Sequence, residues 1–307
     1  MAPVSRALER LIEILDLEPI EKDIFRGQNE APDRTRLFGG QVAAQSLVAA
    51  GRTVEERAVH SLHAYFLRPG DPAVPVVFSV DRIRDGSSFT TRRVVAIQHG
   101  QAILNMSVSF HVSEPGFEHG SAMPEVPDPE SLPTWEERIR EVGDKIPEEA
   151  RKWMQGERAI DFRSVGGMLM FGDPAEEGEP SQIWMRTNGT LPDDPFLHRC
   201  VATYASDMSL LDNIIRRHVK GFRFRTVMMA SLDHALWFHR DFRVDDWLLY
   251  VQESPAAASA RGFARGQIFD REGRLVASVA QEGLMRPIGK RGESDGKRDE
   301  SDGGVPL

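Results

Sequence analysis

Three polar side chains in the second half of the sequence could do chemistry: one at a predicted helix start and two in predicted apolar strands. Asp207 lies in ASDMSLLDNIIRRHV, Ser231 in VMMASLDHALWF and Gln281 in RLVASVAQEGLM. An Asp at a predicted helix N-terminus commonly caps backbone N–H groups, and a buried Ser or Gln is commonly satisfied by a hydrogen bond. The matching place in the first half, Phe38-Gly39-Gly40-Gln41, has no acid. If capping were all that the fold required, both halves could share it, so a helix cap and a catalytic acid both remain open for Asp207.

Other catalytic and metal-binding patterns are weaker. His60 and His63 are three residues apart on a predicted strand, which points them to opposite faces, and His234 and His239 have the same difficulty. No metal site is expected. A G-x-S-x-G sequence at 292–296 has charged flanks instead of a strand and a helix, so it is not a nucleophile elbow. Cys200, the single cysteine, has no adjacent base and is expected to be a packing residue.

Composition narrows the function classes further. The 307 residues carry 38 Lys+Arg and 47 Asp+Glu, a formal charge of −9, and no basic run long enough to follow a nucleic-acid backbone. No apolar run approaches the roughly 20 residues that span a bilayer, and the N-terminus lacks the pattern of a signal peptide. We expect a cytoplasmic protein with no nucleic-acid partner and no stable membrane insertion.

The elements that must position these residues follow from periodicity. Ser5 is expected to cap a helix with Leu8, Leu11 and Leu15 on one face. FGGQVAAQSLVAAG predicts a helix that can be buried on all sides, because its residues are small. Four runs rich in Val, Ile, Phe and Thr between 59 and 112 are separated by Gly turns and predict an antiparallel meander.

The same order of elements recurs in the second half. LHAYFLRPG corresponds to DHALWFHR, and VDDWLLYVQES, SARGFARGQIFDREG and RLVASVAQEGLMR repeat the rest of the meander. The helix of the second copy is expected to begin at Ala205-Ser206-Asp207. A helix wrapped by a curved antiparallel sheet, written twice, predicts an α+β double hotdog. The expected parts are an N-terminal hotdog repeat (1–115), a Pro-rich and helical linker (116–157), a C-terminal repeat (158–288) and a disordered charged tail (289–307).

The sequence resembles a known family over about residues 7–286. The segments RLFGGQVAAQSL, VHSLHAYFLRPGD, RDGSSFTTRRVVAIQHG, PGFEH, SLDHALWFHR, WLLYVQES, SARGFARG and LVASVAQEGLMR are similar to the type II acyl-CoA thioesterases. The resemblance implies a double hotdog that hydrolyses fatty acyl-CoA to free fatty acid and CoA, and at least a homodimer. It also implies a site of an Asp, a Ser or Thr, and a Gln, which fall on Asp207, Ser231 and Gln281.

These three residue types suit direct attack of water on a thioester. Ionised Asp207 can act as a general base while Ser231 and Gln281 orient the water, so neither a cofactor nor an acyl-enzyme is needed. Backbone N–H groups at a helix N-terminus would meet the oxyanion. Candidate substrate contacts are Gly39 and Gly40, with Arg261 and Arg265 for CoA phosphates.

Two other functions remain open on the sequence. A hotdog enoyl-CoA hydratase would need an Asp/His pair near the helix start, and ASDMSLLDN has no His. A non-catalytic acyl-CoA-binding regulator would follow if the three polar residues were disturbed, but all three are present. Ser231 is not expected to be a nucleophile, because His234 lies three residues along the strand and so on the opposite face.

Overall fold

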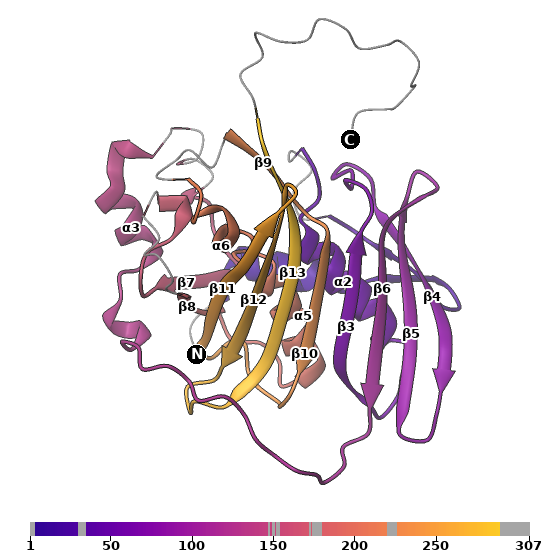
Figure 1. Cartoon of the computed structure of the whole chain (residues 1–307). Coiled ribbons are helices and arrows are strands. Elements are labelled where there is room, and N and C mark those ends of the chain that lie inside the picture. The colour runs from indigo at the N-terminus through magenta and orange to yellow at the C-terminus, as the bar shows by residue number, and fades with distance from the viewer. Residues whose placement is uncertain are drawn as a thin grey trace, which may run out of the picture.

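One continuous antiparallel sheet curves around two central helices, α2 (Gly39–Gly51) and α5 (Pro195–Ser206) (Figure 1). This computed structural model describes residues 4–29, 35–146, 148, 151, 154–171, 173, 180–219 and 226–288. The charged tail predicted at 289–307 and the G-x-S-x-G sequence at 292–296 lie outside the described residues.

The sheet contains thirteen strands among the described residues. Those of the first half are β1 (Glu18–Glu21), β2 (Ile24–Gly27), β3 (Ala58–Phe66), β4 (Val76–Asp85), β5 (Phe89–Gln98) and β6 (Gln101–His111). Those of the second half are β7 (Ile160–Ser164), β8 (Ser181–Thr187), β9 (Val227–Ser231), β10 (Asp233–Phe238), β11 (Leu248–Ala258), β12 (Arg261–Phe269) and β13 (Leu275–Pro287). The spatial order is β1-β2-β4-β5-β6-β3-β10-β13-β12-β11-β8-β7, with β9 also paired to β13.

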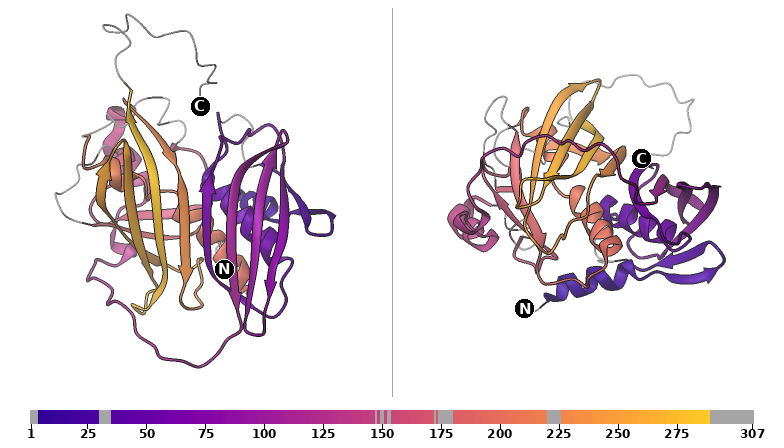
Figure 2. Two further views of the ribbon diagram at one scale, coloured as in Figure 1. Left: turned by 45° about the vertical axis from the view of Figure 1, so that its right-hand side comes forward. Right: turned by 90° about the horizontal axis from the view of Figure 1, so that it is seen from below.

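The two halves of this order correspond strand by strand outward from the β3–β10 pair, where Leu236 lies opposite Leu62. Thus β6, β5 and β4 on one side match β13, β12 and β11 on the other. The predicted internal repeat and the double hotdog are therefore confirmed. The two halves of the sheet lie side by side in Figure 2. The predicted meander is correct for β4-β5-β6 but wrong for β3, which lies on the far side of β6. That position gives β3 a hydrogen-bonded partner on each side and closes the centre of the sheet.

The helix α2 is buried along almost its whole length, from Gly40 to Ala50, as its small residues predict. Its neighbour α5 begins earlier than expected. The side chain of Asp194 accepts a hydrogen bond from the Phe196 N–H, and Pro195 occupies the first turn, where a missing N–H costs nothing. The predicted helix start at 205–207 is wrong, because Asp207 lies at the C-terminal end of α5. The one-turn helix α6 (Asp212–Ile215) follows it.

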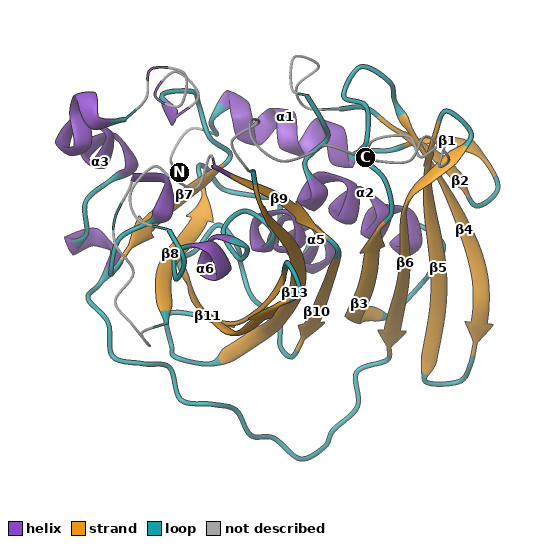
Figure 3. Cartoon of the chain, turned by 45° about the horizontal axis from the view of Figure 1, so that its top comes forward, coloured by secondary structure: helices purple, strands orange, loops and turns teal. Residues whose placement is uncertain are grey.

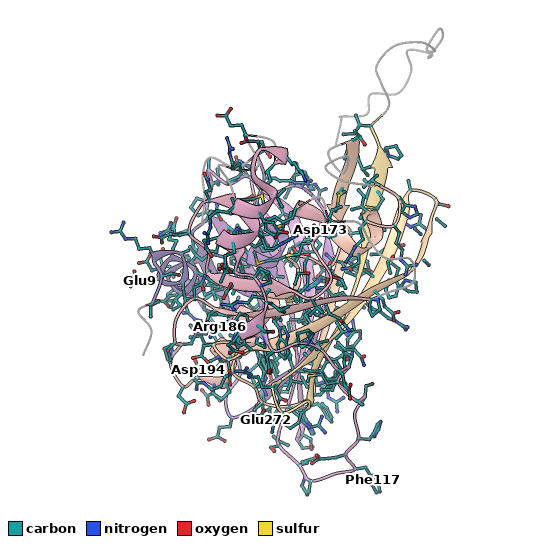
Figure 4. The ribbon with its side chains drawn as sticks, turned by 90° about the vertical axis from the view of Figure 1, so that its left-hand side faces the viewer. Glu9, Phe117, Asp173, Arg186, Asp194 and Glu272 are labelled. Carbon is teal, nitrogen blue, oxygen red and sulfur yellow. The ribbon has the colours of Figure 1, made fainter. Side chains whose placement is uncertain are left out.

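Peripheral helices connect the halves. The helix α1 (Arg6–Leu15) is capped by Ser5, as expected, and runs along the lower edge of the right-hand view in Figure 2. Between the halves, the chain passes along one rim, where Phe117 projects into solvent (Figure 4), before α3 (Trp135–Val142). Thr134 begins α3 with a capping box. Three-residue 3₁₀ turns lie at Pro129–Ser131, Gly143–Lys145 and Leu169–Phe171. Within the described residues, no helix is long and apolar enough to cross a membrane.

Candidate active site

Asp207 lies where the C-terminal end of α5 meets the N-terminal end of α2 (both helices are seen in Figure 3). A buried polar network holds the chain in this position. The Tyr250 hydroxyl donates to the Ser206 carbonyl at 3.2 Å, and Gln252 Nε2 donates to Ser209 Oγ at 2.7 Å. Asn213 in α6 donates to Gln252 Oε1 at 2.6 Å. The turn that carries Asp207 is therefore fixed to β11 from both sides.

The structure brings together all three side chains expected to form the site. Gln281 Nε2 on β13 donates to Asp207 Oδ1 at 2.6 Å, and Ser231 Oγ at the end of β9 donates to the same oxygen at 3.4 Å. The backbone N–H of Gly40 is a further donor to this carboxylate. Asp207 is 9% exposed and Gln281 is fully buried. The carboxylate therefore has three donors in a largely desolvated place.

Desolvation dominates the electrostatics of Asp207. Burial raises its pKa, and hydrogen bonds from Gln281, the Gly40 N–H and Ser231 offset part of that rise, so the pKa lies at about 6 instead of the usual 3.8. The N-terminal end of α2 contributes to this environment through the Gly40 N–H, which donates to Asp207, whereas the N-cap residue Phe38 makes no side-chain capping bond. The N-terminus of a helix also favours a negative charge beside it.

The glycine pair at the start of α2 is required by close approach. A Cβ atom on Gly39 would lie 2.8 Å from Asp207 Oδ2 and 3.0 Å from the Phe66 ring. A Cβ atom on Gly40 would lie 2.5 Å from the Tyr204 carbonyl oxygen. Glycine at both positions therefore lets the two helix ends meet, which is how Gly39 and Gly40 come to border the carboxylate.

A one-residue shift in strand register aims Ser231 at Asp207. Gly283 lies opposite Ser231, whereas Ala280 lies opposite Ala235, so one extra residue is accommodated between β9 and β10. The side chain of Asp233 fills the gap by accepting the Glu282 N–H at 2.6 Å.

The placement of His234 on the face opposite Ser231 is wrong, because this shift turns both inward. His234 is fully buried, yet its ring contacts Ser206 Oγ at 2.8 Å, whereas Ser231 contacts Asp207.

A mainly apolar cavity of about 90 Å³ lies against the two residues that follow Asp207. It is lined by Phe38, Arg158, Phe162, Met168, Met170, Tyr204, Met208 and Ser209. Met208 and Ser209 directly follow Asp207, and Phe38 directly precedes the glycine pair. Methionine side chains adapt their shape readily, so three of them give this cavity a deformable wall.

The remaining predicted site residues lie elsewhere. Arg261 and Arg265 alternate along β12 with buried residues, so they lie on the outer face of the sheet, away from Gln281. Arg261 pairs with Glu282 at 2.9 Å and Arg265 with Glu253 at 2.6 Å. Cys200 lies inside α5, and burial raises the pKa of its thiol well above the usual value. This cysteine packs in the core, as expected.

Comparison with known proteins decides the family. A relative named "Acyl-CoA thioesterase 2" from Haemophilus influenzae is 38% identical over 287 residues, covering 92% of this chain and 99% of that protein. The chain belongs to the acyl-CoA thioesterase family. The family model "Acyl-CoA thioesterase" matches residues 172–284 of this thioester hydrolase, and "Acyl-CoA thioesterase N-terminal domain" matches residues 29–111.

Other relatives agree with this assignment. "Acyl-coenzyme A thioesterase 8" of Mus musculus is 40% identical over 283 residues, covering 89% of this chain and 88% of that protein. The crystal structure of acyl-CoA thioesterase II TesB2 from Mycobacterium marinum is 43% identical, with a TM-score of 0.74 over 90% of this chain and 98% of that one. This similarity covers both halves of the chain, so the whole double-hotdog fold is common to this thioesterase and the Mycobacterium marinum structure.

Proposed function

We propose that this thioesterase hydrolyses medium- and long-chain fatty acyl-CoA by direct attack of water, with Asp207 as the general base and Ser231 and Gln281 as orienting groups. The observation that carries the proposal is the meeting of a desolvated carboxylate, two hydrogen-bonding side chains and the first turn of α2, next to residues that line an apolar cavity. The cavity would take the part of the acyl chain next to the thioester.

The proposed reaction runs in two steps. Water held by Asp207 attacks the thioester carbonyl carbon and gives a proton to the carboxylate, and the carbonyl oxygen becomes an oxyanion beside the first turn of α2. Collapse of this tetrahedral intermediate breaks the carbon–sulfur bond, and protonated Asp207 returns its proton to the leaving CoA thiolate. The products are free fatty acid, CoA and an enzyme in its starting state.

Ser231 enters this proposal as a donor to Asp207 and not as a nucleophile. A serine nucleophile needs a base to remove its proton; the base that Ser231 Oγ contacts is the Asp207 carboxylate, at 3.4 Å, and the proposal assigns this base to the attacking water. His234, the histidine nearest in sequence, is occupied by Ser206. Mass spectrometry of quenched enzyme should therefore find no acyl group on Ser231.

Release of thiol from decanoyl-CoA, followed with a thiol reagent, tests the function directly. We expect turnover by the wild-type enzyme and a loss of roughly 10²–10⁴-fold in Asp207→Asn, because the amide cannot accept the proton. Loss of enoyl absorbance from enoyl-CoA without thiol release would indicate a hydratase, and tight acyl-CoA binding without either would indicate a regulator. Near-normal turnover by Asp207→Asn would remove Asp207 as the base.

Three further features belong to the proposal. Contact of Arg261 and Arg265 with CoA phosphates requires them to leave their carboxylate partners, so alanine at either position should raise KM for acyl-CoA if they serve this role.

The proposal also includes a homodimer or larger homo-oligomer, which light scattering tests. A cytoplasmic location is tested by cell fractionation.

A further inference from the structure

Two buried polar atoms beside the proposed site have no hydrogen-bond partner among the described residues: Nδ1 of His234 and Oε1 of Gln281. Both side chains are fully buried. The other polar atom of each is engaged, because His234 Nε2 lies 2.8 Å from Ser206 Oγ and Gln281 Nε2 donates to Asp207 at 2.6 Å. Unpaired buried polar atoms are unfavourable, so two of them on neighbouring side chains require an explanation.

The two side chains are direct neighbours across β10 and β13. Ala235 lies opposite Ala280, so the next pair along the ladder is His234 and Gln281, and both face inward. The Gln281 amide also acts on the imidazole, raising its pKa, although burial lowers that pKa overall to about 4. The ring is therefore neutral at neutral pH and carries one proton, on either Nδ1 or Nε2.

The hydrogen-bond inventory selects between these two tautomers. With the proton on Nε2, the ring donates to Ser206 Oγ, and bare Nδ1 faces bare Oε1, leaving two acceptors without a donor. With the proton on Nδ1, the ring can donate to Gln281 Oε1 while the Ser206 hydroxyl donates to Nε2. Ser206 Oγ also lies 2.9 Å from the Thr203 carbonyl, so its proton has a place in either arrangement. Only the Nδ1–H tautomer provides a donor for Oε1.

We propose that His234, neutral and protonated on Nδ1, is a positioning residue that fixes the amide of Gln281 with its N–H toward Asp207. This inference rests on the proposed function. A flipped amide would place its carbonyl oxygen against the carboxylate and remove a donor from the general base. His234 thus acts through Gln281 and does not contact the substrate. Among the described residues, Asp207 lies beyond Gln281 and Tyr250 beyond Ser206, and the neighbouring carboxylate on β10, Asp233, accepts the Glu282 N–H.

Three substitutions separate positioning from packing. His234→Asn places an amide N–H near the position of Nδ1, whereas His234→Gln extends an amide toward Ser206 and leaves Gln281 without its donor. His234→Leu removes both functions. We expect His234→Leu and His234→Gln to lower kcat roughly 10- to 100-fold with little change in KM, and His234→Asn to retain most activity. In His234→Leu and His234→Gln, the acid limb of the kcat/KM profile should move to higher pH. In both variants Gln281 is no longer held with its N–H toward Asp207, and that N–H lowers the pKa of Asp207.

A merely structural histidine would give a different pattern. Equal losses in His234→Asn and His234→Gln, or an unmoved acid limb in His234→Leu, would overturn the proposal. Nitrogen NMR of the wild-type enzyme at pH 7 tests it without any variant, because protonated and bare ring nitrogens have distinct shifts; a bare Nδ1 on His234 would also overturn it. Asp207→Asn is measured in parallel. If that variant keeps its turnover, the proposed function fails, whereas the tautomer result decides the role of His234 alone.

Discussion

Asp207 must be ionised to take a proton from water, and its burial determines the pH at which this happens. Its pKa of about 6 predicts that kcat/KM rises with pH through an acid limb centred near 6 and is level above about 7. Gln281→Leu removes the nearest donor to the carboxylate, so its acid limb should lie at higher pH than that of the wild-type enzyme. Rates measured from pH 4.5 to 8.5 check both expectations. An acid limb near pH 4 in the wild-type enzyme would contradict the desolvated site.

The same burial makes Asp207 costly for the fold. Its pKa is raised on folding from 3.8 to about 6, so the folded state holds the proton more tightly and stability falls as pH rises between these values. The loss is complete above pH 6 and amounts to about 3 kcal/mol for a shift of about two units. We therefore predict that Asp207→Asn is more stable than the wild-type enzyme at pH 8, by up to about 3 kcal/mol in urea unfolding. The difference should vanish near pH 4.

Ser231 and Gln281 act on one carboxylate, but at different distances. The contact from Gln281 is 2.6 Å and that from Ser231 is 3.4 Å, so Gln281→Ala should lose more activity than Ser231→Ala. We expect roughly 10- to 100-fold in kcat for Gln281→Ala and the lower end of that range for Ser231→Ala. Ser231→Thr keeps the hydroxyl and should stay active. The double alanine variant should lose less than the product of the single losses, because both residues serve the same water. A fully inactive Ser231→Ala would instead favour a serine nucleophile.

At the scale of elements, the site depends on two helix ends that meet through glycine. Gly39→Ala would place a methyl group 2.8 Å from Asp207 Oδ2, so we predict at least about a 10-fold loss in kcat/KM as the helices separate or the carboxylate turns away. Gly116→Ala is the matched control, because its Cβ atom would meet nothing within 4 Å. Steady-state kinetics with circular dichroism measures both. Equal activity in the two variants would show that close approach at Gly39 is unnecessary.

The sequence predicts the elements better than it predicts where they begin and which neighbours they have. The small residues of α2 and the Gly turns between β4, β5 and β6 are local signals, and these elements form as predicted. The start of α5 also has a local signal, Asp194-Pro195, but the apolar pattern after Asp207 favoured a later helix. The position of β3 beside β10 depends on a contact between halves, which strand periodicity does not encode.

In the candidate site, too, the sequence predicts the local features but not those that depend on tertiary contacts. Ser231 and Gln281 are recognisable as polar residues in apolar strands, and Asp207 as an acid that the first repeat lacks; the structure brings the three together. The sequence does not predict how these side chains are oriented, because strict alternation along a strand places Ser231 and His234 on opposite faces. The one-residue shift between β9 and β10 reverses that parity, and only the pairing with β13 reveals it. The glycine pair contributes from the other repeat, so its role depends on the tertiary fold.

At the scale of the whole molecule, the site needs both halves in fixed register, because α2 comes from one and Asp207, Ser231 and Gln281 from the other. The β3–β10 ladder joins the halves at the sheet, and α1 joins them on the opposite side. Ser5 at its start bonds to the Asn188 carbonyl, while Leu8 packs near Gly189. The chain after α1 enters β1 of the first half. We expect a helix whose apolar face packs on both halves to couple them into one unfolding unit.

Leu8→Ala tests this coupling. Leu8 is fully buried, so its truncation should destabilise the protein by about 2–5 kcal/mol while leaving a single unfolding transition. Glu9→Ala is the matched control, since Glu9 is the next residue of α1 and is exposed (Figure 4). Calorimetry with thiol release measured at the same temperatures checks the prediction. Because Asp207 and the first turn of α2 separate when the halves do, activity should be lost at the melting transition of each variant. Two separate transitions in Leu8→Ala, with activity lost at the first, would show that the halves unfold independently once α1 is loosened.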